Sequence, residues 1–394
     1  MGIVMKYIVD NSDNRISSYD TLKQVIDESS QEIFGDYDDH EENSKQKMPK
    51  PCFAETEPST TGMHGIDMEQ VAKKQDKSPF KYFLDGSRHV YKTCDMVIAG
   101  NVYPVVAGQI IVGCCKREDR NIVKHDFIRK IVLAVPQQFV YDKQNGQTEN
   151  YLRKRCIEIN EEIKKHSTHF QFEFSRLICY NTDGDIEQGR NKYLHQAITV
   201  IQNEMMDQEQ IMVGRLCTSE DNILNNASWL VKDGTLEYKR EFTNRPDENL
   251  DIAQYKHKLK NVIGISKNFD AELLSSQEPK IGKIIAELPP YHRTNAYRYV
   301  HQKKTYCVWY LRLRNTPNRA TRYSDVVKVE FIMPNETPIS LGHIDTISTH
   351  LINEAYPVCF GKDTRWANHL YPVYLTEAFC KSQYMNDSII VKMI

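Results

Sequence analysis

Two Asp-Gly pairs are the residues in this chain whose type and setting could do chemistry. Leu84-Asp85-Gly86-Ser87 and Val231–Leu236 each place an aspartate at the end of an apolar segment that is typical of a strand. The glycine that follows permits close approach of a ligand or of another backbone. Two such aspartates on neighbouring strands, joined by a glutamate from a helix, form an all-oxygen site suited to Mg²⁺ or Mn²⁺. Either pair alone is more typical of a hairpin turn.

Other catalytic patterns are missing from the sequence. None of the ten cysteines forms a C-x-x-C pair, so zinc-knuckle and thioredoxin spacings are excluded. The chain has no P-loop, no G-x-S-x-G elbow and no H-E-x-x-H motif. Asp183–Glu187 resembles part of a calcium loop but lacks the spacing of that loop, and we interpret it as an acidic turn.

Basic residues concentrate in residues 280–328, which we call the basic strip. It holds eleven Lys and Arg against two acidic residues, whereas the whole chain carries 51 basic and 53 acidic residues. Tyrosines and one tryptophan are interleaved with them, and aromatic faces can stack on unpaired bases while basic groups neutralise phosphates. The alternative is a solvated face whose aromatic residues belong to the core. The residues expected to contact DNA are Arg293, Arg298, Lys303, Lys304, Arg312 and Arg314.

Six short motifs follow one another along the chain. They are Phe83–Arg88, Val231–Tyr238, Val262–Lys267, Trp309–Arg314, Val327–Glu330 and Tyr371–Ala378. In this order they resemble the NurA nuclease family, over roughly residues 80–394. The resemblance implies an RNase H-like core and a DNA nuclease that depends on Mn²⁺ or Mg²⁺. It also implies a homodimer that works with a hexameric HerA-like ATPase, in DNA end processing or in anti-phage defence.

The resemblance assigns metal ligands position by position. Asp85 and Asp233 match the two metal-binding aspartates of the family. The family's metal-binding glutamate lies on the long helix before the second aspartate, and there we choose Glu209, with Glu204 as the second choice. One or two divalent ions held by Asp85, Glu209 and Asp233 would then support a phosphodiester displacement of the two-metal type.

Three further positions carry expectations from the same motifs. Lys267 would contact the scissile phosphate or offset charge in the transition state. Tyr371 matches the tyrosine of the C-terminal motif. The family places a histidine where this chain has Phe379, which cannot ligate a metal or move a proton. His369 and His343 are left as possible replacements for that histidine.

The elements that would position these residues follow from hydrophobic periodicity, which predicts an α/β fold with an RNase H-like mixed sheet flanked by helices. Strand, tight turn and strand are expected around Asp85-Gly86-Ser87. Further strands are predicted at 97–98, 103–107, 109–114, 128–135, 170–180, 228–231, 262–265, 307–313 and 326–332. Helices are predicted at Glu149–Ser167, Asn191–Leu216, Asp345–Ile352 and Leu375–Tyr384.

The first 75 residues differ in composition from the rest. An acidic run over 36–42 and a Pro-, Ser- and Thr-rich stretch over 43–62 bury little apolar area. We therefore expect a variable, partly disordered appendage over 1–75, with a short helix around Tyr19–Ile33, and a nuclease-like domain over 76–394. No apolar run is long enough to span a membrane, and the cysteine pattern suits a cytoplasmic setting.

Three functions fit the sequence. The first is a metal-dependent DNA nuclease that acts with a HerA-like ATPase. The second is a catalytically inactive RNase H-like subunit that binds DNA or the ATPase, which Phe379 and the N-terminal segment motivate. The third is a small-molecule phosphotransferase, which the absence of a phosphate loop disfavours.

Overall fold

The structure is a computed structural model, and it describes most of the 394 residues. The described ranges are 2–12, 15–19, 24–26, 52–73, 78–119, 121–140, 148–166, 172–182, 192–238, 252–301, 304–316, 321–333, 337–355 and 370–394. Several expectations lie outside them: the acidic run 36–42, the acidic turn 183–187, Lys303 and His369.

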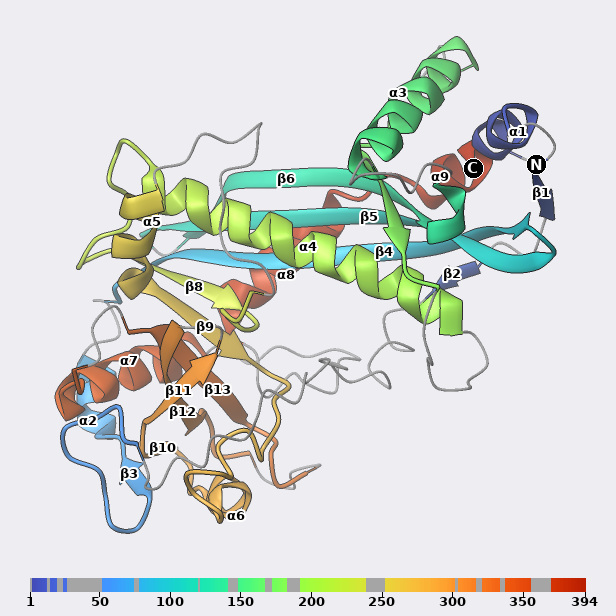
Figure 1. The fold of residues 1–394 in the computed structure, drawn as a ribbon. Coiled ribbons are helices and arrows are strands. Elements are labelled where there is room, and N and C mark those ends of the chain that lie inside the picture. Colours follow the sequence, from blue (N-terminus) through green and yellow to red (C-terminus); the bar gives the residue numbers. More distant parts are fainter. Residues whose placement is uncertain are drawn as a thin grey trace.

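Within the described ranges, one mixed sheet of 13 strands organises the fold (Figure 1). The strands are β1 (Ile16–Tyr19), β2 (Gln24–Ile26), β3 (Met63–Gly65), β4 (Phe80–Ile98), β5 (Asn101–Glu118), β6 (Asn121–Pro136), β7 (Arg176–Tyr180), β8 (Trp229–Asp233), β9 (Val262–Ser266), β10 (His292–Thr294), β11 (Tyr297–His301), β12 (Lys304–Arg312) and β13 (Val326–Ile332). Their order is β3-β10-β12-β13-β9-β8-β4-β5-β6-β7, with β1 and β2 paired to β4 and β11 paired to β12.

The helices flank this sheet, which confirms the predicted fold class of a mixed α/β sheet flanked by helices. They are α1 (Ile3–Asp10), α2 (Met68–Lys73), α3 (Thr148–His166), α4 (Lys192–Thr218), α5 (Ile252–Lys258), α6 (Ile281–Glu287), α7 (Leu341–Glu354), α8 (Tyr371–Ser382) and α9 (Asp387–Met393), with 3-10 turns η3 (Gln137–Phe139) and η4 (Leu259–Asn261). Among the described residues no helix is long and apolar enough to cross a membrane.

Periodicity located the long helices well. Helices α3 and α4 match the predicted segments to within two residues at each end. Helices α7 and α8 begin one turn earlier than predicted. Pro372 lies in the first turn of α8, where its fixed φ and its missing N–H are tolerated.

The expected turn at Asp85-Gly86-Ser87 is wrong, because β4 runs without a break from Phe80 to Ile98. Asp85 pairs with Gly113 of β5 in an antiparallel ladder that continues on both sides. The chain reverses instead at Ala99 and Gly100, which both have positive φ. A glycine inside a strand marks a place where another group comes close rather than a turn.

The second aspartate stands where the sequence placed it. Strand β8 runs parallel to β4 and ends at Asp233, and Gly234 follows it with a φ of 83°. Strand β9 is parallel to β8 on its other side, and β13 and β12 then continue the sheet with antiparallel pairing. Asp233 therefore lies at the carboxyl end of a central strand, next to the strand that carries Asp85.

Helices α4 and α8 cover opposite faces of the sheet centre (Figure 1). A Cβ at Gly108 of β5 would press against Ile201 of α4, whereas one at Gly113 would press against Phe379 and Cys380 of α8. Side chains alternate between faces along a strand, and Gly108 and Gly113 are an odd number of residues apart. The two faces are called below the α4 face and the α8 face.

The described parts of residues 1–75 are built into the fold, whereas the sequence predicted an appendage. Helix α1 packs on α3 and α9, and its Val4, Met5 and Ile8 are buried. Strands β1 and β2 pair with β4, so residues 24–26 are a strand where a helix was expected. Strand β3 pairs with β10, and α2 contacts α7.

Candidate active site

Asp85 and Asp233 lie side by side on the α8 face of the sheet. In the parallel ladder between β4 and β8, Leu84 is opposite Lys232, so the residues that follow each of them are neighbours. Asp85 is buried, with 6% of its surface exposed, and Asp233 is half-buried at the end of β8. Two carboxylates on adjacent rigid strands are held close together despite their mutual repulsion.

A third carboxylate comes from α8. Glu377 is half-buried, and one carboxylate oxygen each from Asp85, Asp233 and Glu377 lie within 4.8 Å of one another. We call these three residues the carboxylate cluster. Glu377 is a site residue that was not predicted from the sequence, although it lies in the Tyr371–Ala378 motif and in a predicted helix. Its position in that motif is the signal that could have found it.

Lys267, which follows strand β9, lies next to the carboxylate cluster and contacts two of its members. Its Nζ lies 2.7 Å from Oδ2 of Asp233 and 3.8 Å from Oε2 of Glu377. Burial alone would lower the pKa of Lys267, but the surrounding carboxylates, Asp233 first among them, outweigh burial and raise the pKa. Lys267 is therefore a fixed positive charge among the carboxylates.

The electrostatics of the carboxylate cluster favour a cation. Burial raises the pKa of Asp85 well above its ordinary range, and the neighbouring Asp233 carboxylate raises it further. An ionised carboxylate in such a place is costly unless it is paired or coordinates a metal. Lys381, one turn along α8, also pairs with Glu377 at 3.0 Å but is 44% exposed, so water screens it.

Glu209, the predicted third ligand, lies apart from the carboxylate cluster. It is buried on α4, and its Oε2 lies 2.8 Å from Nζ of Lys232. Lys232 and Asp233 are consecutive on β8 and so point to opposite faces of the sheet. The predicted set of Asp85, Glu209 and Asp233 is thus corrected: the two aspartates gather with Glu377, and Glu209 pairs with Lys232 on the α4 face. Glu204, the second choice, pairs with Arg176 at 3.0 Å instead.

Helix α8 carries both aromatic positions that the resemblance singled out, Tyr371 and Phe379. Tyr371 is the first residue of α8, six residues before Glu377. Phe379 packs edge to face against Phe127 of β6, with ring centroids 6.0 Å apart, and Lys124 lies 4.3 Å above the Phe127 ring. Phe379 is thus half-buried in an aromatic contact at the position where the resemblance expected a histidine. His343, one suggested replacement, lies on α7 and packs on Trp229 at the other end of β8.

The basic strip is not a continuous DNA-binding surface, because three of its arginines are buried. Arg293 is fully buried and pairs with Glu55 at 2.8 Å and with Asp345 at 2.7 Å. Arg312 donates to backbone carbonyls, among them that of Leu288 at 2.6 Å. Arg314 is buried and donates to the carbonyl of Ala355. These three residues act in the interior, which corrects the expectation that they contact DNA.

The other residues of the basic strip differ in how far they are buried. Arg298 on β11 and Lys304 on β12 are both half-buried, and they pair with Cys307 and His301 in the ladder between the two strands. The interleaved aromatic residues belong mainly to the core: Tyr297, Tyr306, Trp309 and Tyr310 are buried. The alternative interpretation of the basic strip, in which its aromatic residues belong to the core, is therefore correct for these four.

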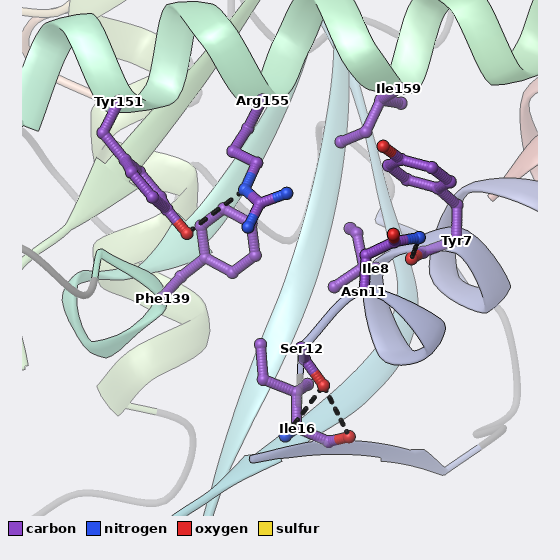
Figure 2. A pocket seen from close by; sticks show the side chains of 9 residues that line it. All are labelled: Tyr7, Ile8, Asn11, Ser12, Ile16, Phe139, Tyr151, Arg155 and Ile159. Carbon is purple, nitrogen blue, oxygen red and sulfur yellow. Dashed lines mark hydrogen bonds between the residues drawn. The ribbon is translucent and has the colours of Figure 1, made fainter. Parts of the chain in front are cut away.

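Two hollows lie away from the carboxylate cluster. One is enclosed by α1, α3 and η3, and Figure 2 shows Tyr7, Tyr151 and Arg155 around it. Its volume of about 10 Å³ suits roughly one water molecule. The other, of about 490 Å³, lies at the beginning of β4 and β8, beside Trp229 and His343. Neither hollow is lined by a residue of the carboxylate cluster.

Comparison with known proteins adds little to this geometry. No family model matches the chain, and no curated protein matches it. Among solved structures, the NurA nuclease from Sulfolobus solfataricus aligns with a TM-score of 0.39 and 10% identity, over 83% of this chain and 91% of that one. A likeness of this degree carries no argument about function.

Proposed function

We propose that the chain is a nuclease that hydrolyses phosphodiester bonds with a divalent cation, Mn²⁺ or Mg²⁺, at the carboxylate cluster. The observation that carries the proposal is the meeting of three carboxylate oxygens from β4, β8 and α8 within 4.8 Å. Their elements are distant in sequence, yet the fold directs all three to one point. Such an arrangement is costly unless a cation compensates it.

The donor set fits a hard divalent cation. Three carboxylate oxygens, with no sulfur or imidazole ligand among the described residues, suit Mg²⁺ or Mn²⁺ rather than Zn²⁺. The raised pKa of Asp85 supports the same reading, because burial and Asp233 disfavour its ionised form until positive charge is added. The residues that would hold the ion are Asp85, Asp233 and Glu377.

Asp85 and Asp233 would hold the bound ion, and Lys267 would have a distinct role beside it. A bound divalent ion supplies Lewis-acid polarisation of a phosphoryl oxygen and a better nucleophile from water. The strand backbones hold Asp85 and Asp233 rigidly, so these carboxylates need little reorganisation to hold the ion. Lys267, 2.7 Å from Asp233, places a positive charge where a phosphate could share it.

We extend the proposal to DNA as substrate and to a HerA-like hexameric ATPase as partner of a homodimer. The support is the resemblance of six motifs to the NurA family, together with the positions of three of them. Asp85, Asp233 and Glu377 come from the first, second and last of these motifs. DNA end processing or anti-phage defence in the cytoplasm is the role that this partnership would serve.

A catalytically inactive subunit of the ATPase complex is the second candidate. The observation that favours it is Phe379, whose ring packs on Phe127 and offers no proton or ligand. Such a subunit would bind DNA or the ATPase without cutting DNA under any divalent ion.

A nuclease assay separates the two candidates. Labelled single- and double-stranded DNA is incubated with Mn²⁺, Mg²⁺ or EDTA, with and without the ATPase. We expect cleavage that needs the ion and is lost in Asp85→Asn. The matched control is Asp126→Asn on β6, whose carboxylate lies 3.9 Å from Arg215 of α4 and away from the cluster. DNA binding without cleavage in every condition would overturn the nuclease and favour the inactive subunit.

A further inference from the structure

The ion pair between Glu209 and Lys232 is buried directly behind the carboxylate cluster. The Nζ of Lys232 lies 2.8 Å from Oε2 of Glu209, and the two side chains are 3% and 6% exposed. Burying two charges is costly, and hydrophobic residues of the same size are often as stable. The position of the Glu209–Lys232 ion pair next to a candidate metal centre therefore indicates that the pair has a function at that centre.

The pair is tied to the cluster by the backbone of β8. Lys232 also donates from Nζ to the carbonyl oxygen of Asp233 at 2.7 Å, so it holds the peptide that carries a candidate ligand. Gly86, the residue after Asp85, makes room for the Glu209 carboxylate, because a Cβ at that position would collide with it. Each of the two Asp-Gly motifs thus contributes an aspartate to the carboxylate cluster on the α8 face. On the α4 face, Gly86 of one motif and Lys232 of the other contact the Glu209 carboxylate.

The charges around the centre match one divalent ion. With all four carboxylates ionised, as in the ion-bound centre, the carboxylate cluster and Glu209 bring four negative charges, and Lys232 and Lys267 bring two buried positive charges. Two negative charges remain, which is the charge that a single divalent ion neutralises. Lys381 is 44% exposed, so water screens its charge. A second divalent ion would therefore leave an excess of two positive charges.

We propose that this centre takes one divalent cation and that Lys232 neutralises Glu209, a task that a second ion would otherwise perform. The inference rests on the proposed function, since it concerns the ion at the same cluster. Glu209 is then a buried carboxylate that Lys232 neutralises, and not a metal ligand. This differs from the two-metal expectation, in which Glu209 was a ligand.

The number of bound Mn²⁺ ions tests the inference without any activity measurement. Titration calorimetry and the loss of the free Mn²⁺ signal in electron paramagnetic resonance count the ions on the full chain. We expect one ion per chain for the wild type, and one ion in Glu209→Gln/Lys232→Met, bound within about threefold of the wild-type affinity because the pair is replaced without a net charge change. Two ions in the wild type, or loss of an ion in the double variant, would overturn the inference.

A single substitution gives the opposite prediction. Lys232→Met leaves Glu209 unpaired near Asp233, so a second and weaker Mn²⁺ ion should bind, which a purely structural role would not cause. A count that stays at one in folded Lys232→Met would contradict the inference, and circular dichroism shows whether that variant is folded. If it does not fold, the wild type and the double variant decide. A wild type that binds no Mn²⁺ would instead refute the proposed metal centre itself.

Discussion

The ammonium group of Lys267 lies 2.7 Å from the carboxylate of Asp233, inside a cluster that we assign to a divalent ion. The lysine has two opposed effects there. It neutralises the carboxylates while no ion is bound, and it repels an ion that enters. The same positive charge is available to a substrate phosphate once the ion is in place.

Lys267→Met should therefore bind Mn²⁺ more tightly and cleave DNA more slowly. Removal of a buried positive charge next to the ion should raise affinity by at least about fivefold, since charges a few Å apart interact by several kcal/mol at the dielectric of a protein interior. Calorimetry measures the affinity and single-turnover cleavage measures the rate. Lys283→Met, whose side chain is 69% exposed, is the control and should change neither. Weaker Mn²⁺ binding in Lys267→Met would contradict the assignment.

Gly86→Ala should destabilise the fold. A methyl group at this position would collide with the Glu209 carboxylate and disturb the pair with Lys232. Overpacking of this kind typically costs about 1–3 kcal/mol, which urea unfolding can measure. Gly342→Ala is the matched control: it lies in helix α7 with open space around it, so alanine should leave the stability unchanged or raise it. Equal stability of Gly86→Ala and wild type would refute the close packing at Gly86.

Glu55→Gln tests the assignment of Arg293 to the interior. Burial alone would raise the pKa of Glu55, but His64 and Arg293 hold it below its ordinary value of 4.5. Ionised Glu55 thus adds stability that is fully present above the unfolded pKa and is lost as pH falls through the folded pKa, below 4.5.

At neutral pH the substitution should cost about 3 kcal/mol or more, because it removes a partner of a buried charge, and it should flatten the loss of stability in acid. Chemical unfolding as a function of pH measures both. Glu69→Gln removes only an exposed pair with Lys73 and should cost less than about 0.5 kcal/mol. An unchanged acid slope in Glu55→Gln would mean that Arg293 does not depend on this pair.

Local pattern was enough for part of this fold. The 3.6-residue period located α4 and α8, and an apolar run that ends in Asp233-Gly234 located both β8 and its turn. The same reasoning failed at Asp85-Gly86, because the glycine serves the approach of Glu209, a contact between residues far apart in the chain. A turn prediction that uses only neighbouring residues cannot detect such a contact.

The candidate site was half predictable for the same reason. Asp85 and Asp233 follow from their motifs, and Asp233 also from the end of its strand, but the choice between Glu209 and Glu377 depends on which helix lies on which face of the sheet. The excess positive charge of the basic strip led to a wrong prediction, namely that its buried arginines contact DNA. Arg293 is neutralised by Glu55, which is distant in sequence, and a count of charges along the chain does not reveal burial.

The rate of Mn²⁺-dependent DNA cleavage by Glu377→Gln tests the central claim most directly. The substitution keeps the shape of the side chain and removes the charge of the third candidate ligand. We expect the rate at a fixed Mn²⁺ concentration to fall by at least about a hundredfold, with the fold intact, because even outer-shell changes at metal centres cost up to that much. Glu161→Gln, on the exposed side of α3, should cleave like the wild type. Wild-type cleavage by Glu377→Gln would contradict the assignment of the site.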